Sequence, residues 1–243
     1  MAQISASMVK ELRGRTGAGM LDCKKALVES EGDIEAAGEW LRKKGLAAAA
    51  KKSGRVTAEG LVGLRTDGAR GALVEVNAET DFVARKEHFQ AFVGAAADVA
   101  LNVGGNLDAL ISADHPEGGT VDEQHVLLIA TIGESIKIRR SVGLSVEEGV
   151  VASYMHNSAA PGLGKIGVLV GMKSAAEPEA LQQLGKQVAM HVAASSPRAV
   201  TAEDLDAETV EKEREILREQ AAGSGKPPEI VEKMIEGRLR KFY

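Results

Sequence analysis

The sequence has 243 residues, of which 44% are hydrophobic and 27% are charged, a composition typical of a globular protein rather than a disordered chain. Its net charge of -5 argues against direct nucleic-acid binding, because the neutralisation of phosphates supplies most of that affinity. No apolar stretch approaches the roughly 18 residues of a membrane span, and the first residues lack the basic and apolar regions of a secretory signal. With a single cysteine, which excludes an internal disulfide, these features predict a cytoplasmic protein.

The first 45 residues are predicted to form a module of three short helices. Apolar residues recur at helical spacing in three runs, separated by a glycine-rich break and by a Gly-Asp turn. The residues that mark the inward faces are Met8, Val9, Leu12, Cys23, Ala26, Leu27, Ile34, Ala37 and Leu41. The second helix is expected from about Asp22 to Ser30, and residues 46–57 are expected to be a small-residue, basic linker.

Residues 58–206 show strand-like periodicity and contain a weak internal repeat. The strands and helices predicted for the first copy lie near 61–64, 71–76, 89–100, 121–132 and 136–144. The second copy has strand-like segments near 148–151 and 167–172, then a helix in which His191 is expected to pack into the core. The apolar residues that mark this helix are Leu181, Leu184, Val188 and Val192. We therefore predict two related α+β lobes with small antiparallel sheets, at 58–145 and 146–206.

Residues 207–243 are predicted to form a helical hairpin, because two charged helical segments, 207–222 and 228–242, flank a Gly- and Pro-containing break at 223–227. The apolar seam of this hairpin is expected to consist of Val210, Ile216, Leu217, Ile230, Met234, Ile235 and Leu239. The predicted fold class is thus α+β, with an all-helical module at each end.

No set of residues points to catalysis or to a bound metal. Cys23 lies on an apolar helix face, where a thiol acts as a small hydrophobic side chain. The five histidines lack the spacing of metal ligands. Residues 162–165 resemble a phosphate-binding loop only superficially, because they lie between two predicted strands, and a hairpin turn is expected there. We therefore expect a protein that is not an enzyme and that needs no cofactor.

The segment Thr80-Asp81-Phe82-Val83 places one of four phenylalanines in a polar connection between a strand and a helix. The corresponding connection of the second copy, residues 173–178, has no aromatic residue. In one interpretation, Phe82 folds inward onto the following helix as a hydrophobic staple, with Asp81 as the N-cap. In the other, Phe82 is an exposed anchor beside a carboxylate, a pair typical of interface hot spots. The residue pattern alone leaves both interpretations open.

Five motifs follow one another along the chain. They are Leu12-Arg13-Gly14-Arg15-Thr16-Gly17-Ala18-Gly19-Met20-Leu21-Asp22-Cys23-Lys24, Glu79-Thr80-Asp81-Phe82-Val83-Ala84-Arg85, Ile132-Gly133-Glu134, Gln187-Val188-Ala189-Met190-His191-Val192-Ala193-Ala194 and Gly225-Lys226-Pro227. With these motifs in this order, the sequence resembles the elongation factor Ts family essentially from end to end.

The resemblance implies guanine-nucleotide exchange on elongation factor Tu, which would be bound in its GDP-bound and nucleotide-free states. It also implies that the first module is similar to a ubiquitin-associated domain and that the hairpin is a coiled coil. The module is expected to dock on the partner's GTPase domain through Arg13, Met20, Leu21 and Lys24. Thr80, Asp81, Phe82 and Val83 are expected to enter near the nucleotide site and to disturb its Mg²⁺. Further contact positions are matched by Ile132, Gly133 and His156.

The residue pattern and the resemblance leave several points open. Met20 and Leu21 also fit core residues that close the loop between two helices. The alternative function is a non-catalytic adaptor that binds a helical or ubiquitin-like partner through the first module. Typical bacterial members continue past the hairpin with a returning segment and a C-terminal helix, whereas this sequence ends at Tyr243. Some members form dimers or heterotetramers, so a homodimer and a heterotetramer both remain to be considered.

Overall fold

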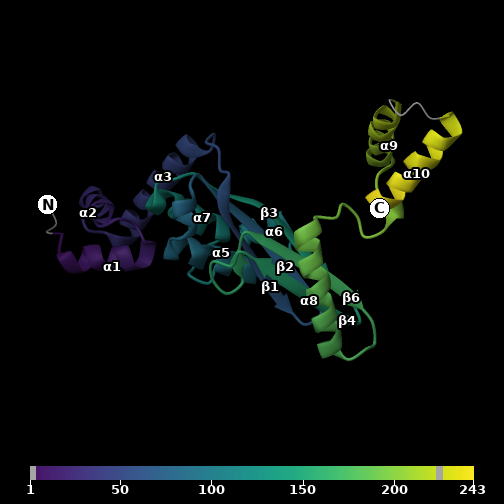
Figure 1. Cartoon of the computed structure of the whole chain (residues 1–243). Helices are drawn as coiled ribbons and strands as arrows, with labels where there is room; N and C mark the ends of the chain where they lie inside the picture. The colour runs from purple at the N-terminus through teal and green to yellow at the C-terminus, as the bar shows by residue number, and fades with distance from the viewer. Residues whose placement is uncertain (1–3, 223–226) are drawn as a thin grey trace. The chain divides into compact units, whose positions relative to one another are not determined.

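The computed structural model describes residues 4–222 and 227–243 (Figure 1). Contacts between Cα atoms divide the chain after Ala194 into two compact units. The first unit combines helices with two antiparallel sheets, and the second is helical. The predicted α+β class is therefore confirmed.

Three helices open the chain: α1 (Ala6–Thr16), α2 (Met20–Glu29) and α3 (Ile34–Lys52). Ser5 and Asp33 cap α1 and α3, because their side chains accept hydrogen bonds from backbone N–H groups of the first turn. The buried residues between the helices include Leu12, Cys23, Ala26, Leu27, Ala37 and Leu41, as the helical spacing predicted.

Two expected boundaries in this region are wrong. Helix α2 begins at Met20 rather than Asp22, since the extended backbone of Gly19 occupies the N-cap position. Residues 46–52 are not a linker, because α3 continues through them to Lys52. Alanine is the strongest helix former, and this part of α3 holds four alanines in a row. Gly45 also brings α3 close to Val126, so tertiary packing supports the longer helix.

The strands form one four-stranded sheet in the order β3-β2-β1-β5 and one two-stranded sheet of β4 and β6, all antiparallel. Their bounds are β1 (Glu59–Asp67), β2 (Arg70–Ala78), β3 (Ile136–Ser145), β4 (Gly149–His156), β5 (Leu163–Gly164) and β6 (Ile166–Lys173). The helices between and after them are α4 (Asp81–Ala84), α5 (Glu87–Asn102), α6 (Leu107–Ser112), α7 (Val121–Ile132) and α8 (Pro178–Ser195). The sequence pattern did not predict the short elements α4, α6 and β5.

The main core lies between the four-stranded sheet and helices α5 and α7. It contains Val74 and Val76 from β2, Phe89 and Val93 from α5, and Ile129 from α7, all buried. Alternate residues of β2 face the core, as expected for a strand with one covered face.

The internal repeat is present as two β-hairpins, each followed by a helix. Residues 162–165 lie in the connection between β4 and β6, where a turn was expected. In addition, Leu163 and Gly164 pair with Gly63 and Val62 of β1, so this connection also extends the first sheet.

The buried face of α8 differs from the expected one. Leu181, Gly185 and Ala189 face inward, while Leu184 and Val188 are exposed. A Cβ at Gly185 would lie 2.4 Å from the Cβ of Ala152, so small residues let the helix approach β4 closely. His191 is exposed, and the expectation that it packs into the core is wrong.

In the second unit, α9 (Ala207–Ala222) and α10 (Pro228–Phe242) have the predicted bounds. They pack through Leu217, Ile235 and Leu239, whereas Ile216 and Ile230 are exposed and lie off the seam. Residues 223–226 of the predicted break lie outside the described residues, as does most of the Gly225-Lys226-Pro227 motif. Residues 195–206, which were assigned to the second lobe, group with this hairpin by contacts. The finer division into five parts stays a prediction.

Candidate functional site

Thr80 precedes and Asp81–Val83 begin α4, a single helical turn between β2 and α5. Val83 and Ala84 point into the main core and are buried. Successive residues of a helix are rotated by about 100°, so residues on either side of a buried pair face away from the core. Phe82 accordingly lies on the outer side, with 70% of its surface exposed. Burial of the two residues that follow it thus fixes the direction of this phenylalanine.

This geometry decides between the two interpretations of the segment. Phe82 does not fold inward as a staple, because Val83 and Ala84 occupy the inward positions. Asp81 is not the N-cap either: Thr80 holds that position and Asp81 is the first helical residue. The Asp81 carboxylate instead accepts a hydrogen bond from Arg85 at 3.1 Å. The result is an exposed aromatic ring beside an ion pair between the half-buried Asp81 and the exposed Arg85.

Two carboxylates connect this turn to the start of β3. Glu134 accepts hydrogen bonds from both the backbone N–H of Thr80, at 3.0 Å, and its hydroxyl, at 2.8 Å. Glu79 accepts one from the backbone N–H of the buried Ser135 at 2.5 Å and pairs with Arg55 at 3.2 Å. The Ser135 N–H, aided by Arg55, holds the pKa of the Glu79 carboxyl below its ordinary value. Glu79 and Glu134 lie in two of the five sequence motifs, but sequence reasoning did not assign them a role.

Ile132 and Gly133 lie at the end of α7, next to Glu134. Gly133 adopts a φ of 86° and donates its N–H to the carbonyl of Ile129 at 2.9 Å, so it ends the helix in a left-handed cap that favours glycine. This structural role is separate from any partner contact. Gly133 is exposed and Ile132 is half-buried. Through Glu134, the structure brings these two predicted contacts together with Thr80.

The four predicted contacts of the first module lie on α1 and α2. Arg13 and Lys24 are exposed, and Met20 and Leu21 are 60% and 84% exposed at the start of α2. The interpretation of Met20 and Leu21 as core residues is therefore wrong, since the inward positions of α2 belong to Cys23, Ala26 and Leu27. No hydrogen bond or ion pair in the described part of the chain joins these four side chains to α4. They define a second surface.

His156 ends β4 and is exposed. One of its ring nitrogens, Nδ1, lies 3.0 Å from the hydroxyl of Tyr154, and the two rings are 6.0 Å apart. Its backbone carbonyl accepts a hydrogen bond from the N–H of Lys165. His156 therefore lies on the two-stranded sheet, apart from the elements that carry Phe82 and Leu21.

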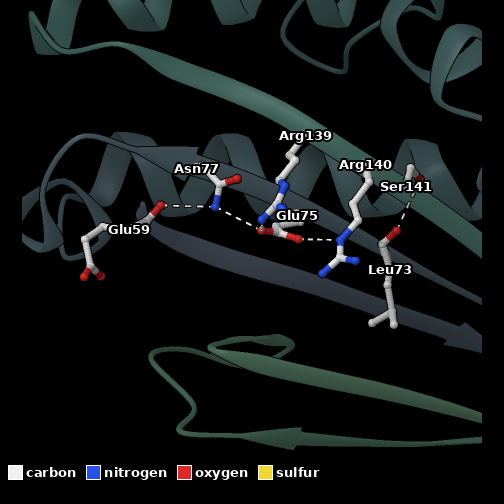
Figure 2. A network of polar contacts seen from close by, with 7 residues as sticks. All are labelled: Glu59, Leu73, Glu75, Asn77, Arg139, Arg140 and Ser141. Carbon is white, nitrogen blue, oxygen red and sulfur yellow. Dashed lines mark hydrogen bonds and ion pairs between the residues drawn. The ribbon is translucent and has the colours of Figure 1, made fainter. Parts of the chain in front are cut away.

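A charged cluster that sequence reasoning missed lies on β2 and β3, where Arg139 and Arg140 donate to the two carboxylate oxygens of Glu75 (Figure 2). Asn77 donates to the same carboxylate and to the carbonyl of Glu59. Partial burial alone would raise the pKa of Glu75, but hydrogen bonds from Arg140, Asn77 and Arg139 hold it below its ordinary value. The pairing of β2 with β3 is interrupted by a β-bulge next to Glu75. The cluster therefore stabilises an irregular part of the sheet.

Other chemically active groups do not assemble into a site in the described part of the chain. Burial raises the pKa of the Cys23 thiol, which disfavours the reactive thiolate. Within residues 4–222 and 227–243, no three His, Cys, Asp or Glu side chains gather in a way that would hold a metal ion. None of the helices described there combines the length and apolar character needed to cross a bilayer.

Comparison with known proteins adds the family context. The family model described as "Elongation factor TS" matches residues 79–243. The chain is 61% identical over 245 residues to a protein of Rhodospirillum rubrum named elongation factor Ts, covering 100% of this chain and 79% of that protein. Proteins of the same name from Sphingopyxis alaskensis and Gluconobacter oxydans are 61% and 59% identical to this chain over 243 residues. Both alignments cover 100% of this chain, and 79% and 80% of the relatives' own lengths.

Proposed function

The chain belongs to the elongation factor Ts family, and we propose that it is a guanine-nucleotide exchange factor for elongation factor Tu that promotes GDP release through Asp81 and Phe82. In this role it converts no substrate and is not an enzyme. Its effect comes from binding a partner whose own nucleotide it loosens.

The exposed ring of Phe82 on a well-anchored turn is the observation that carries this proposal. Phe82 is 70% exposed although phenylalanine is among the residues most often buried in proteins. An aromatic side chain has two torsions to fix, so it offers a large contact area at a small entropic cost. Asp81, half-buried beside it, can add directional hydrogen bonds to the partner. Together they suit insertion into a site that contains Mg²⁺ and phosphates.

Thermodynamic linkage explains how such contacts release a nucleotide without any catalytic group. If this protein binds nucleotide-free elongation factor Tu more tightly than the GDP-bound form, its binding must lower the affinity of elongation factor Tu for GDP by the same factor. Typical coupling free energies are about 1–3 kcal/mol, or roughly 5- to 150-fold in affinity. The protein therefore needs only contacts that differ between the two states of its partner.

The direct test measures GDP release. Elongation factor Tu loaded with a fluorescent GDP analogue is mixed with excess unlabelled GDP, with and without this protein. We expect release to accelerate with the concentration of the protein and to reach a plateau. If the release rate stays at that of elongation factor Tu alone over the whole range, the proposed function is wrong.

A second prediction concerns docking through the first module. Replacing Met20 and Leu21 together by alanine should raise the concentration needed for half-maximal acceleration by about tenfold, the effect of losing about 1.4 kcal/mol of binding. The maximal rate should change little, because the insertion at Phe82 is retained. Both side chains are exposed and alanine is a good helix former, so stability should stay within about 0.5 kcal/mol.

Val28→Ala is the matched control, because Val28 is 55% exposed near the other end of the same helix. An unchanged half-maximal concentration in the double variant would contradict the docking role. The adaptor function predicts a different pattern: the double variant loses all partner binding, while Phe82→Ala has no effect.

A further inference from the structure

The antiparallel pairing of β2 with β3 ends just before the Phe82 turn. Its last pair is Ala78 opposite Ile136, so continued pairing would place Glu79 opposite Ser135 and Thr80 opposite Glu134. At these two positions side chains replace the missing ladder. The Glu79 carboxylate binds the Ser135 N–H, and the Glu134 carboxylate binds the Thr80 N–H. Each strand extension thus supplies a carboxylate to a backbone amide of the other.

We propose that Glu79 and Glu134 form a carboxylate clamp that positions Phe82 for insertion into the partner, with Glu134 as the principal positioning residue. This inference rests on the proposed exchange function, because it assigns the residue that sets the direction of its anchor. Neither carboxylate needs to touch the nucleotide or its Mg²⁺.

Glu134 acts on Phe82 through Thr80, which directly precedes the α4 turn. A four-residue helical turn is too short to be stable alone, since helix nucleation costs more than one turn regains. Burial of Val83 and Ala84 holds the inner side of this turn. Its N-terminal end is held by the two hydrogen bonds that Thr80 donates to Glu134. Without Glu134, Phe82 would sample more directions, and binding would then include the cost of ordering it.

The second half of the clamp keeps Glu134 itself in place. Ser135 is buried, so its N–H depends on a protein acceptor, and Glu79 provides one. Hydrogen bonds to an ionised carboxylate are about twice as strong as neutral ones. Arg55, in the segment after α3, pairs with the same carboxylate at 3.2 Å. The clamp therefore joins the Phe82 turn, the Ile132–Gly133 corner and the segment that follows the first module.

The clamp itself is tested in the free protein by amide hydrogen exchange. The Thr80 N–H should be protected, and Glu134→Ala should speed its exchange by about tenfold or more, because its acceptor is lost. Glu134→Gln keeps an acceptor oxygen but loses the charge, so its Thr80 N–H should exchange at a rate between those of the wild type and Glu134→Ala. This variant keeps the test decisive if the alanine variant misfolds. If Thr80 exchanges equally fast in the wild type and in Glu134→Ala, the clamp is refuted.

The positioning role is tested by stimulated GDP release. Glu134→Ala should slow the maximal rate by about tenfold, because displacing a group by a fraction of an ångström removes much of its effect. Thr80→Ser, which keeps the hydroxyl, should retain more of the rate than Thr80→Val. Glu147→Ala, an exposed carboxylate in the turn between β3 and β4, is the matched control.

A double variant separates positioning from general stability. If Glu134 acts only through Phe82, then Glu134→Ala should slow release little further once Phe82 is alanine, so the two effects are not additive. Additive effects would overturn the positioning role, as would loss of Thr80 protection with an unchanged release rate. A wild-type protein that fails to accelerate release would refute the proposed function and the positioning role together. Amide exchange of Thr80 in the free protein would still show whether the clamp exists.

Discussion

Phe82→Ala should slow stimulated GDP release by about thirtyfold, the effect of losing about 2 kcal/mol at an interface hot spot. The loss should appear mainly in the maximal rate, since the docking that we propose for Met20 and Leu21 does not involve this ring. The side chain is largely exposed, so its removal leaves no cavity in the core. Thermal unfolding of the variant should therefore match that of the wild type.

Val200→Ala serves as the control for Phe82→Ala. Val200 is 97% exposed in the second compact unit, so its truncation also removes an exposed apolar side chain. Release stimulated by this control should stay at the wild-type rate. A Phe82→Ala protein with wild-type activity would show that the exposed ring is not the anchor, even if the exchange function itself is correct.

Phe89→Ala, unlike Phe82→Ala, should greatly lower the stability of the protein. Phe89 lies seven positions further along the chain, is fully buried on α5 and packs in the main core with Val74 and Val76 of β2. Truncation of a buried phenylalanine typically costs about 3–5 kcal/mol, because transfer free energy is lost and a cavity remains. Urea unfolding followed by circular dichroism should show a lower midpoint at an unchanged slope.

Phe82→Ala is the internal control for this stability measurement, because both variants remove the same atoms. A change of less than about 1 kcal/mol in Phe89→Ala would mean that the core between α5 and the sheet relaxes around the gap. In that case stability would not distinguish the buried phenylalanine from the exposed one.

Periodicity predicted the long elements because burial on one face imposes a repeat on their sequence. The bounds of α9 and α10 and the alternation along β2 follow from this. Periodicity failed where small residues set the packing. On α8 the apolar Leu184 and Val188 suggested the inward face, but the close approach at Gly185 turned another face to the sheet.

The sequence predicted which segment forms the candidate site, but not how its side chains are arranged. Thr80–Val83 was identified by an aromatic residue in a polar connection and by its motif. The direction of Phe82 depends on Val83 and Ala84 being buried, which a four-residue turn is too short to reveal as a pattern. The roles of Glu79 and Glu134 depend on the register of β2 against β3, between residues more than 50 positions apart. No local pattern encodes such a pairing.

The pairing of β5 with β1 has a consequence for synthesis of the chain. Strand β1 is complete at Asp67, whereas its neighbour begins at Leu163, about 100 residues later. At about 5–20 residues per second, the open side of β1 waits roughly 5–20 s for its partner after leaving the ribosome. An unpaired strand edge readily pairs with other chains. A nascent chain that stalls before Leu163 therefore leaves Val62 and Gly63 of β1 without the partner that they have in the finished protein.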